Sequence, residues 1–341
     1  MGRQARRMRA TRVATALCST LGALGALGPL DAMAQGVTGV TGVAYPVRPV
    51  RMIVPFPPGG TADVLGRIAA RRMEAHYGQS VIVDNRPGAS GHVGAEIAAR
   101  AVGDGHTLMV GTIGIHAAHR LYRKLPYNPV IDLQPVMVYA ENPNVLVVNP
   151  TVPAKTVAEF LALARARPGE LNFGTAGSGS SIHMVTELFM LATGTRMIHV
   201  PYKGSGPALA DLVGGQIQLI FENAPTAQPF VQSGRLRALA VTSARRAPGL
   251  PDLPTLEEAG VKGAVATSWF SIAITHTAPA ALVERLNTDL RQILGRPEVA
   301  DEFNKLSITL IASTPAEARR FFASETAKWS RVIDSAKIQL D

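Results

Sequence analysis

The chain has 341 residues, of which 47% are apolar and 17% charged, and its formal net charge is +9. This length gives room for two domains of ordinary size, and the apolar share excludes an intrinsically disordered chain. Five arginines and one aspartate within residues 1–34 account for +4 of the charge, which leaves +5 on the remainder. Because no basic run is interleaved with aromatic residues, we expect no nucleic-acid partner, and small anionic molecules fit this charge better.

Residues 1–34 have the pattern of a secretory signal peptide. The basic stretch MGRQARRMRATRVA precedes the apolar run TALCSTLGALGALG, and Ala32-Met33-Ala34 has the small-x-small form of a cleavage site. We therefore predict export to the periplasm, cleavage after Ala34 and a flexible leader over residues 35–46. An uncleaved anchor stays open as an alternative, although the apolar run is short for a bilayer span. Arg6-Arg7 leaves both the Sec and the twin-arginine export routes open.

The only cysteine, Cys18, lies inside the predicted signal. The mature chain would therefore have no disulfide, and we expect its stability to come from packing. No later stretch is long and apolar enough to be predicted as a transmembrane helix.

From residue 47 onward, runs of β-forming residues alternate with segments whose apolar residues recur at helical spacing. Strands are predicted at residues 50–56, 79–85, 106–112, 135–142, 144–150, 171–175, 197–202, 217–223 and 237–243. Helices are predicted at residues 62–78, 92–102, 156–169, 181–194, 207–215, 279–295 and 314–336. Such alternation predicts parallel sheets joined by crossover helices, which is an α/β fold.

A strand, a glycine-rich turn and a helix follow one another in both halves of the chain, at VPFPPGGTADVLGR and at LNFGTAGSGSSIHM. Because the unit recurs, we expect two lobes with a sheet in each. Ligands of such lobes bind at the carboxyl ends of parallel strands, where both turns lie. A helix N-terminus leaves N–H groups unpaired and carries a partial positive charge, so each turn is a candidate anion site made of backbone. If the turns face each other across a cleft, each can hold one carboxylate of a small diacid.

Side chains next to these turns are candidate ligand groups that also have structural interpretations. Thr61 could donate its hydroxyl to a ligand or cap the following helix, and Asp63 is in the first place a cap candidate. The second turn carries four neutral hydroxyl donors, of which one serine is expected to be the helix N-cap: Thr175, Ser178, Ser180 and Ser181.

Weaker candidates lie in other turns. Lys203 in PYKGSGPALA could supply a positive charge to the cleft or be a solvated loop lysine. Ala89 and Ser90 in DNRPGASG could hold the ligand-binding residues in position without contacting the ligand themselves. Glu222, followed by Asn223 at a strand end, could accept a hydrogen bond from a ligand ammonium or hydroxyl group.

The sequence shows no recognisable catalytic or metal-binding motif. The hydrolase elbow G-x-S-x-G, the dinucleotide motif G-x-G-x-x-G and the P-loop are absent. His116, His183 and His199 lack metal-ligand spacing and are interpreted as core or cap residues. We therefore predict a protein that is not an enzyme and that uses no metal and no cofactor.

Six motifs in a fixed order carry a resemblance to a known family: VPFPPGGTAD, DNRPGASG, GTAGSGSSIHM, HVPYKGSGPALADLVGGQI, LRALAVTSARR and LPTLEEAG. Over about residues 45–335 the chain closely resembles the substrate-binding receptors of tripartite tricarboxylate transporters, also called the Bug or TctC family. The resemblance implies a type II periplasmic binding protein fold, with mixed, mostly parallel sheets in two lobes joined by hinge crossings near residues 144–149 and 239–242. Lobe 1 would comprise residues 47–143 and 242–341, and lobe 2 residues 144–241.

The resemblance also implies which residues bind the ligand. Those in or after the glycine-rich turns are Pro58, Gly59, Gly60, Thr61, Asp63, Thr112, Ile113, Thr175, Ser178, Gly179, Ser180, Ser181 and His183. Glu222 stands where the family often has aspartate, and we hypothesise that its longer side chain narrows the far end of the site and favours a shorter ligand.

These observations together predict a monomeric periplasmic receptor for a small organic acid. The ligand would be a mono-, di- or tricarboxylate or an acidic amino acid, delivered to the membrane subunits of a tripartite tricarboxylate transporter. Two alternatives stay open at this point. One is a ligand sensor that signals to a membrane kinase, and the other is a secreted α/β hydrolase or isomerase that uses one of the serines with His183.

Overall fold

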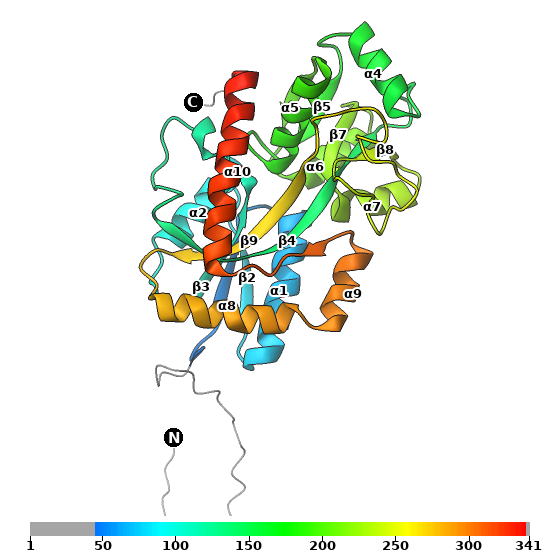
Figure 1. Cartoon of the computed structure of the whole chain (residues 1–341). Helices are drawn as coiled ribbons and strands as arrows, with labels where there is room; N and C mark the ends of the chain where they lie inside the picture. Colours follow the sequence, from blue (N-terminus) through cyan, green and yellow to red (C-terminus); the bar gives the residue numbers. More distant parts are fainter. Residues whose placement is uncertain (1–44, 339–341) are drawn as a thin grey trace, which may run out of the picture. The chain divides into compact units, whose positions relative to one another are not determined.

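The computed structural model describes residues 45–338, shown in colour along the chain in Figure 1. The predicted signal peptide and residues 35–44 of the predicted leader lie outside this range. The strands are β1 (Val50–Val54), β2 (Val81–Asn85), β3 (Thr107–Thr112), β4 (Leu133–Val148), β5 (Asn172–Thr175), β6 (Ile198–Pro201), β7 (Leu219–Asn223), β8 (Arg237–Val241), β9 (Thr267–Thr275) and β10 (Thr309–Leu310). The α-helices are α1 (Thr61–Tyr77), α2 (His92–Ala99), α3 (Ile113–His116), α4 (Val157–Ala166), α5 (Ser181–Thr193), α6 (Ser205–Val213), α7 (Ala224–Gln232), α8 (Ala280–Leu294), α9 (Pro297–Lys305) and α10 (Pro315–Ala336). Two short 3₁₀ turns are η1 (Ala89–Gly91) and η2 (His119–Leu121).

The strands form a mixed sheet in the order β2-β1-β3-β9-β4-β7-β5-β6, with β8 and β10 also paired to β4. β1 runs parallel to β2 and β3, and β5 runs parallel to β6 and β7. Every antiparallel pairing of these strands involves β4 or β9. Helices connect the parallel strands, so the predicted α/β class is confirmed.

Strand β4 is continuous where the sequence predicts two strands. Its first part, from Leu133 to Pro143, pairs with β9, and its second part, from Asn144 to Val148, pairs with β7 and β8. Pro143 breaks the sequence pattern, but it lies where the strand changes partners, a position at which a residue without an N–H is tolerated. β4 therefore joins two groups of strands: a first group with β1, β2, β3 and β9, and a second group with β5, β6, β7 and β8.

The central strand β9 is missing from the predicted strands. The structure places Trp269 and Phe270 in this strand, between β3 and β4, and both side chains are buried. The strand is buried on both faces, so it lacks the period-two alternation that identifies strands in sequence. The sequence also does not predict helix α7, because this helix contains Pro225 and Pro229. Pro225 lies in the first turn, where its absent N–H breaks no helical hydrogen bond.

Helix α10, red in Figure 1, contacts β4, α3 and α5, so it lies against both strand groups. It begins at a capping box formed by Thr314 and Glu317, as its sequence pattern favours. In its third turn, Glu325 Oε2 accepts hydrogen bonds from the indole N–H groups of Trp269 and Trp329, at 2.7 and 2.8 Å. This shared carboxylate ties α10 to the central strand β9. Within residues 45–338, none of the helices combines the length and the apolar character that a bilayer span requires.

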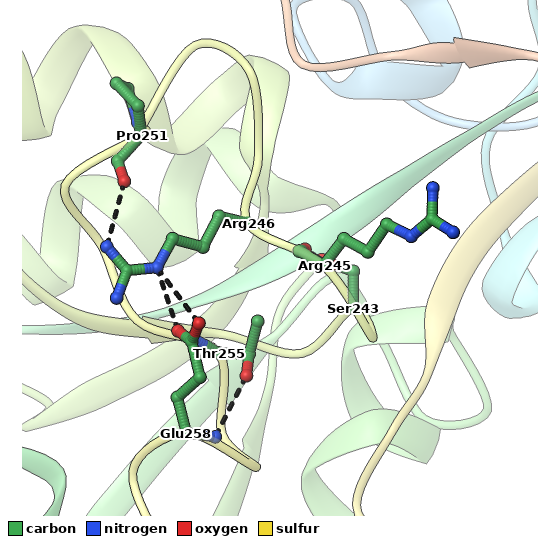
Figure 2. Close-up of polar contacts among 6 residues, drawn as sticks. All are labelled: Ser243, Arg245, Arg246, Pro251, Thr255 and Glu258. Carbon is green, nitrogen blue, oxygen red and sulfur yellow. Dashed lines mark hydrogen bonds and ion pairs between the residues drawn. The ribbon is translucent and has the colours of Figure 1, made fainter.

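The motifs LRALAVTSARR and LPTLEEAG form a loop after β8 that is held together by hydrogen bonds (Figure 2). Arg246 Nε donates to both carboxylate oxygens of Glu258, at 2.9 and 3.2 Å, and Arg246 Nη1 donates to the carbonyl of Pro251 at 3.2 Å. The backbone N–H of Glu258 donates to Thr255 Oγ1 at 3.0 Å. The Arg245 side chain points away from this cluster in Figure 2. These two motifs therefore serve the structure of the loop.

Candidate functional site

The first turns of α1, α5 and α6 surround a small cavity of about 50 Å³, named here the central cavity. Residues 60–62, 180–182 and 204–207 contribute these turns to its wall. Thr112 and Asn223, at the ends of β3 and β7, and Phe270, within β9, also line it. The first turn belongs to the first strand group and the other two to the second group. The cavity therefore lies between the two groups, at the carboxyl ends of parallel strands.

Main-chain N–H groups are the principal donors around the central cavity. The N-caps of α1 and α6 are Gly60 and Gly204, and neither helix has a side-chain cap hydrogen bond. Of these three helices, only α5 has a side-chain cap, in which Ser180 Oγ accepts from the N–H of His183. Since the first N–H groups of a helix have no acceptor within the helix, these turns present donors and a partial positive charge to the cavity. An anionic group is the ligand that this arrangement suits best.

The first turn is held in shape by the carboxylate of Asp63. Its Oδ2 accepts from Gly59 N at 3.0 Å and from Arg67 Nε at 2.9 Å, and its Oδ1 accepts from Asn85 Nδ2 at 2.9 Å. Burial alone would raise the pKa of Asp63, but the hydrogen bonds from Arg67, Gly59 and Asn85 outweigh it and hold that pKa below its ordinary value. Both carboxylate oxygens of Asp63 therefore accept hydrogen bonds from the protein, and they hold the turn in its conformation.

The second turn is held by an imidazole and hydroxyl groups. Gly179 N–H donates to His183 Nδ1 at 3.0 Å, which leaves the ring proton on Nε2, 3.4 Å from Glu187 Oε1. Thr175 Oγ1 accepts from Gly177 N–H at 3.1 Å and lies 2.7 Å from His199 Nε2. Because His183 Nδ1 already accepts from the backbone, it is not free to act as a general base for a serine.

The two strand groups contact each other near the glycine-rich turns. The carbonyl oxygen of Ser178 accepts from Ser90 Oγ at 2.6 Å and from Tyr122 OH at 3.0 Å. Thr61 Oγ1 lies 3.2 Å from Thr226 Oγ1. Ser90 has a backbone φ of +49°, which is costly for a residue other than glycine and is stabilised here by its bond to Ser178. Direct hydrogen bonds therefore join the two strand groups.

A larger cavity of about 540 Å³ adjoins the central one and shares Phe56, Pro57, Ala176 and Gly204 with it. Ala89, Ser90 and the exposed Lys203 line this second cavity. Lys203 is thus placed to contribute a positive charge beside the central cavity.

Glu222 is fully buried at the end of β7, behind the wall of the central cavity. Its Oε1 accepts from Thr226 Oγ1 at 2.6 Å, Ser205 Oγ at 3.0 Å and the N–H of Asn223 at 3.0 Å. Its Oε2 has no hydrogen-bond partner among the described residues. Burial raises the pKa of Glu222 to about 6, while the hydrogen bonds of Thr226, Asn223 and Ser205 oppose the shift.

The predicted site residues thus fall into three places. Those in the wall of the central cavity are Pro58, Gly60, Thr61, Thr112, Ser180 and Ser181. Those in the second cavity are Ala89, Ser90 and Lys203. Those in neither cavity wall are Gly59, Asp63, Ile113, Thr175, Ser178, Gly179, His183 and Glu222.

One residue of the central wall that matters here, Ser205, is not among the residues predicted from the sequence to bind the ligand. The signal for Ser205 was present, because PYKGSGPALA is a third glycine-rich turn that opens a helix. No group of three His, Cys, Asp or Glu side chains within residues 45–338 is placed to hold a metal ion.

A mixed α/β sheet whose helix N-termini enclose a cavity between two strand groups defines a periplasmic binding protein. The solved periplasmic binding protein BugD has this fold, with a TM-score of 0.81, 29% identity and coverage of 86% of this chain and 99% of that one. A sequence model of the tripartite tricarboxylate transporter family receptor, TctC, matches residues 65–338. The chain belongs to that receptor family, which confirms the resemblance and the predicted fold class.

Three further similarities describe its relatives. Protein BugT of Bordetella pertussis is 38% identical over 284 residues, which is 83% of this chain and 87% of BugT. The solved structure of R. palustris Rpa4515 with adipate has a TM-score of 0.84 and 41% identity, and the match covers 86% of this chain and 99% of that one. MatC from Rhodopseudomonas palustris with bound malate has a TM-score of 0.80 and 31% identity, with coverage of 85% and 100%.

Proposed function

We propose that this chain is a periplasmic, non-catalytic receptor that captures a small carboxylate between two lobes and delivers it to the membrane subunits of a tripartite tricarboxylate transporter. Lobe 1 comprises residues 47–143 and 242–341, and lobe 2 comprises residues 144–241. The ligand's carboxylate binds at the uncapped helix N-termini of the central cavity.

The observation that carries this proposal is the convergence of three helix N-termini, from both strand groups, on one cavity. Backbone N–H groups of α1 and α6 are left without side-chain caps, so an anion is their natural acceptor. Hydrogen bonds to a charged group contribute roughly 1.5–3 kcal/mol each, and a few of them suffice for micromolar affinity, about −8 kcal/mol. Two of the relatives described above were solved with adipate and with malate, which are both dicarboxylates.

The proposed lobes are supported by hydrogen bonds at the place where β4 changes partners. Asn144 N–H donates to Thr242 Oγ1 at 3.0 Å, Thr242 N–H donates to Asn144 O at 2.9 Å, and Ser268 Oγ donates to Asn144 Oδ1 at 2.8 Å. All three residues are fully buried. Such a satisfied polar cluster lets two crossing segments bend together without exposing unpaired groups, so ligand binding and lobe closure become one equilibrium.

Calorimetric titration of the purified chain with a panel of organic acids tests the receptor. We expect at least one dicarboxylate to bind with a dissociation constant of about 1 μM or lower. The matched diamides, which have the same length and no negative charge, should not bind. Equal binding of acids and diamides, or hydrolysis of ester analogues by the chain, would contradict the proposal.

Delivery is tested separately by uptake of the bound acid into cells that lack this chain. We expect uptake to return with the wild-type chain and not with a variant that fails to bind the acid. Restored uptake without the transporter's membrane subunits would contradict the assigned partner.

A further inference from the structure

The hydroxyl groups around Glu222 form a chain of hydrogen bonds whose direction follows from counting protons. Glu222 Oε1 accepts from the N–H of Asn223, which is always a donor, and from two hydroxyl groups. A proton on Oε2 would leave this arrangement unchanged, because Oε1 remains an acceptor in either protonation state.

Thr226 has one hydroxyl proton and two acceptors for it, Glu222 Oε1 at 2.6 Å and the carbonyl oxygen of Asn223 at 3.0 Å, of which the carboxylate is the nearer. That proton is therefore not available for Thr61, whose Oγ1 lies 3.2 Å away. In this contact Thr61 is the donor and Thr226 the acceptor. The chain therefore runs from Thr61 to Thr226 to Glu222, and a second branch runs from Ser205 to Glu222.

Thr61 and Ser205 both lie in the wall of the central cavity, whereas Glu222 has no exposed surface. Since their protons point toward Thr226 and Glu222, the two hydroxyl groups have only lone pairs left for a ligand. The helix N-termini next to them present N–H donors. The cavity thus presents main-chain N–H donors and, beside them at the starts of α1 and α6, two hydroxyl oxygens that act as acceptors toward a ligand.

We propose that Glu222 is a positioning residue that makes this receptor select carboxylates bearing a hydroxyl or ammonium donor next to the carboxylate. The helix N-termini hold the carboxylate, and Thr61 and Ser205 accept from the donor. This inference rests on the proposed carboxylate receptor and deepens it by naming the ligand class. It assigns Thr61 the opposite role to the one suggested by the sequence, where its hydroxyl was a candidate donor.

Calorimetry with matched pairs of diacids tests the selection: succinate with malate, glutarate with 2-hydroxyglutarate, and adipate with 2-hydroxyadipate. In the pair of the right length, we expect the hydroxy acid to bind about tenfold more tightly, as one added hydrogen bond gives. Methoxysuccinate, whose oxygen cannot donate, should gain nothing over succinate. Aspartate distinguishes an ammonium donor from the hydroxyl of malate, and preference for either one supports the proposal.

Variants of Glu222 separate hydrogen-bond direction from charge. Glu222→Gln keeps an acceptor oxygen, so the preference for a hydroxy acid should persist. Glu222→Met removes the acceptor and frees the proton of Ser205, while Thr226 can still donate to the carbonyl oxygen of Asn223 at 3.0 Å. The preference for a hydroxy acid should therefore fall several-fold. If Glu222→Met does not fold, Thr226→Val is the second test. It removes the hydroxyl that accepts from Thr61 and should reduce the preference for a hydroxy acid several-fold. Ser233→Ala, at an exposed serine near the end of α7, is the matched control and should change nothing.

The outcomes distinguish the two proposals. If plain diacids bind as well as or better than their hydroxy and amino partners at every length, the selection is overturned and the carboxylate receptor stands. If no acid binds, both fall. If Glu222→Met keeps the wild-type preference in a folded chain, Glu222 does not position the acceptors.

Discussion

The first and second glycine-rich turns serve the same cavity but are supported by different chemistry. In the first, the Asp63 carboxylate accepts from Gly59, Arg67 and Asn85. In the second, His183 accepts from Gly179, and Thr175 accepts from Gly177. Charge holds one turn, and neutral groups hold the other. Both turns place a helix N-terminus at the wall of the central cavity, and each is held in shape by its own set of side chains.

The largest effect is expected at the charged support. Asp63→Ala removes the acceptor of three hydrogen bonds, so we expect unfolding to become easier by about 2 kcal/mol and carboxylate affinity to fall about 100-fold. Chemical denaturation and calorimetry measure the two quantities. Asp252→Ala, at an exposed loop position, is the control. Wild-type affinity in folded Asp63→Ala would show that the first turn needs no support.

At the neutral support a smaller loss is expected. His183→Leu leaves Gly179 N–H without its acceptor, and we expect affinity to fall about tenfold. His183→Asn can present an oxygen near the position of Nδ1 and should recover part of the loss. A loss at His183→Leu as large as that of Asp63→Ala would remove the distinction between the two turns.

Acid should weaken the second turn before the first. Burial lowers the pKa of His199 to about 3, so the folded chain keeps this ring neutral while the unfolded chain takes up a proton below about pH 6.5. The stability contributed by neutral His199 is present above pH 6.5 and is lost as pH falls toward 3. We expect the melting temperature to fall between pH 7 and pH 4, and His199→Gln to flatten that fall. An unchanged pH profile in His199→Gln would contradict this assignment.

The smallest effect is expected where the two strand groups meet at the Ser178 carbonyl. Ser90→Ala leaves the bond from Tyr122 in place, so affinity should fall only a few-fold, mainly through faster ligand release. The double variant with Tyr122→Phe should release ligand faster still. Stopped-flow release rates check this, and identical rates in the double variant would show that these bonds do not hold the closed form.

Much of the fold was predictable because its signals are local. The helices α1, α5, α8 and α10 follow clear apolar periodicity, and the expectation that one serine of the second turn caps a helix is met by Ser180. The sequence does not predict β9, because burial on both faces removes the alternation of apolar and polar residues. It does not predict α7, because proline near the start of this helix is typical of a turn as well. The continuity of β4 through Pro143 was missed because it depends on strands distant in sequence.

The candidate site was predictable in its backbone and less so in its side chains. Pro58, Gly60, Thr61 and Ser181 lie in the cavity wall, while Asp63, Thr175 and His183 turn inward to support the loops. A sequence shows that a side chain can donate or accept, but it does not show which partner takes the proton.

The sequence by itself determined that strands end in glycine-rich turns that open helices, because turn and cap preferences act over a few neighbouring residues. It thereby determined that this chain carries backbone donors for an anion. Only the tertiary structure decided that α6 joins the same cavity, that β4 links two strand groups, and that Thr61 and Ser205 give their protons to a chain ending at Glu222. The physical reason is that a hydroxyl has one proton, and its direction depends on neighbours that only folding brings within hydrogen-bond distance.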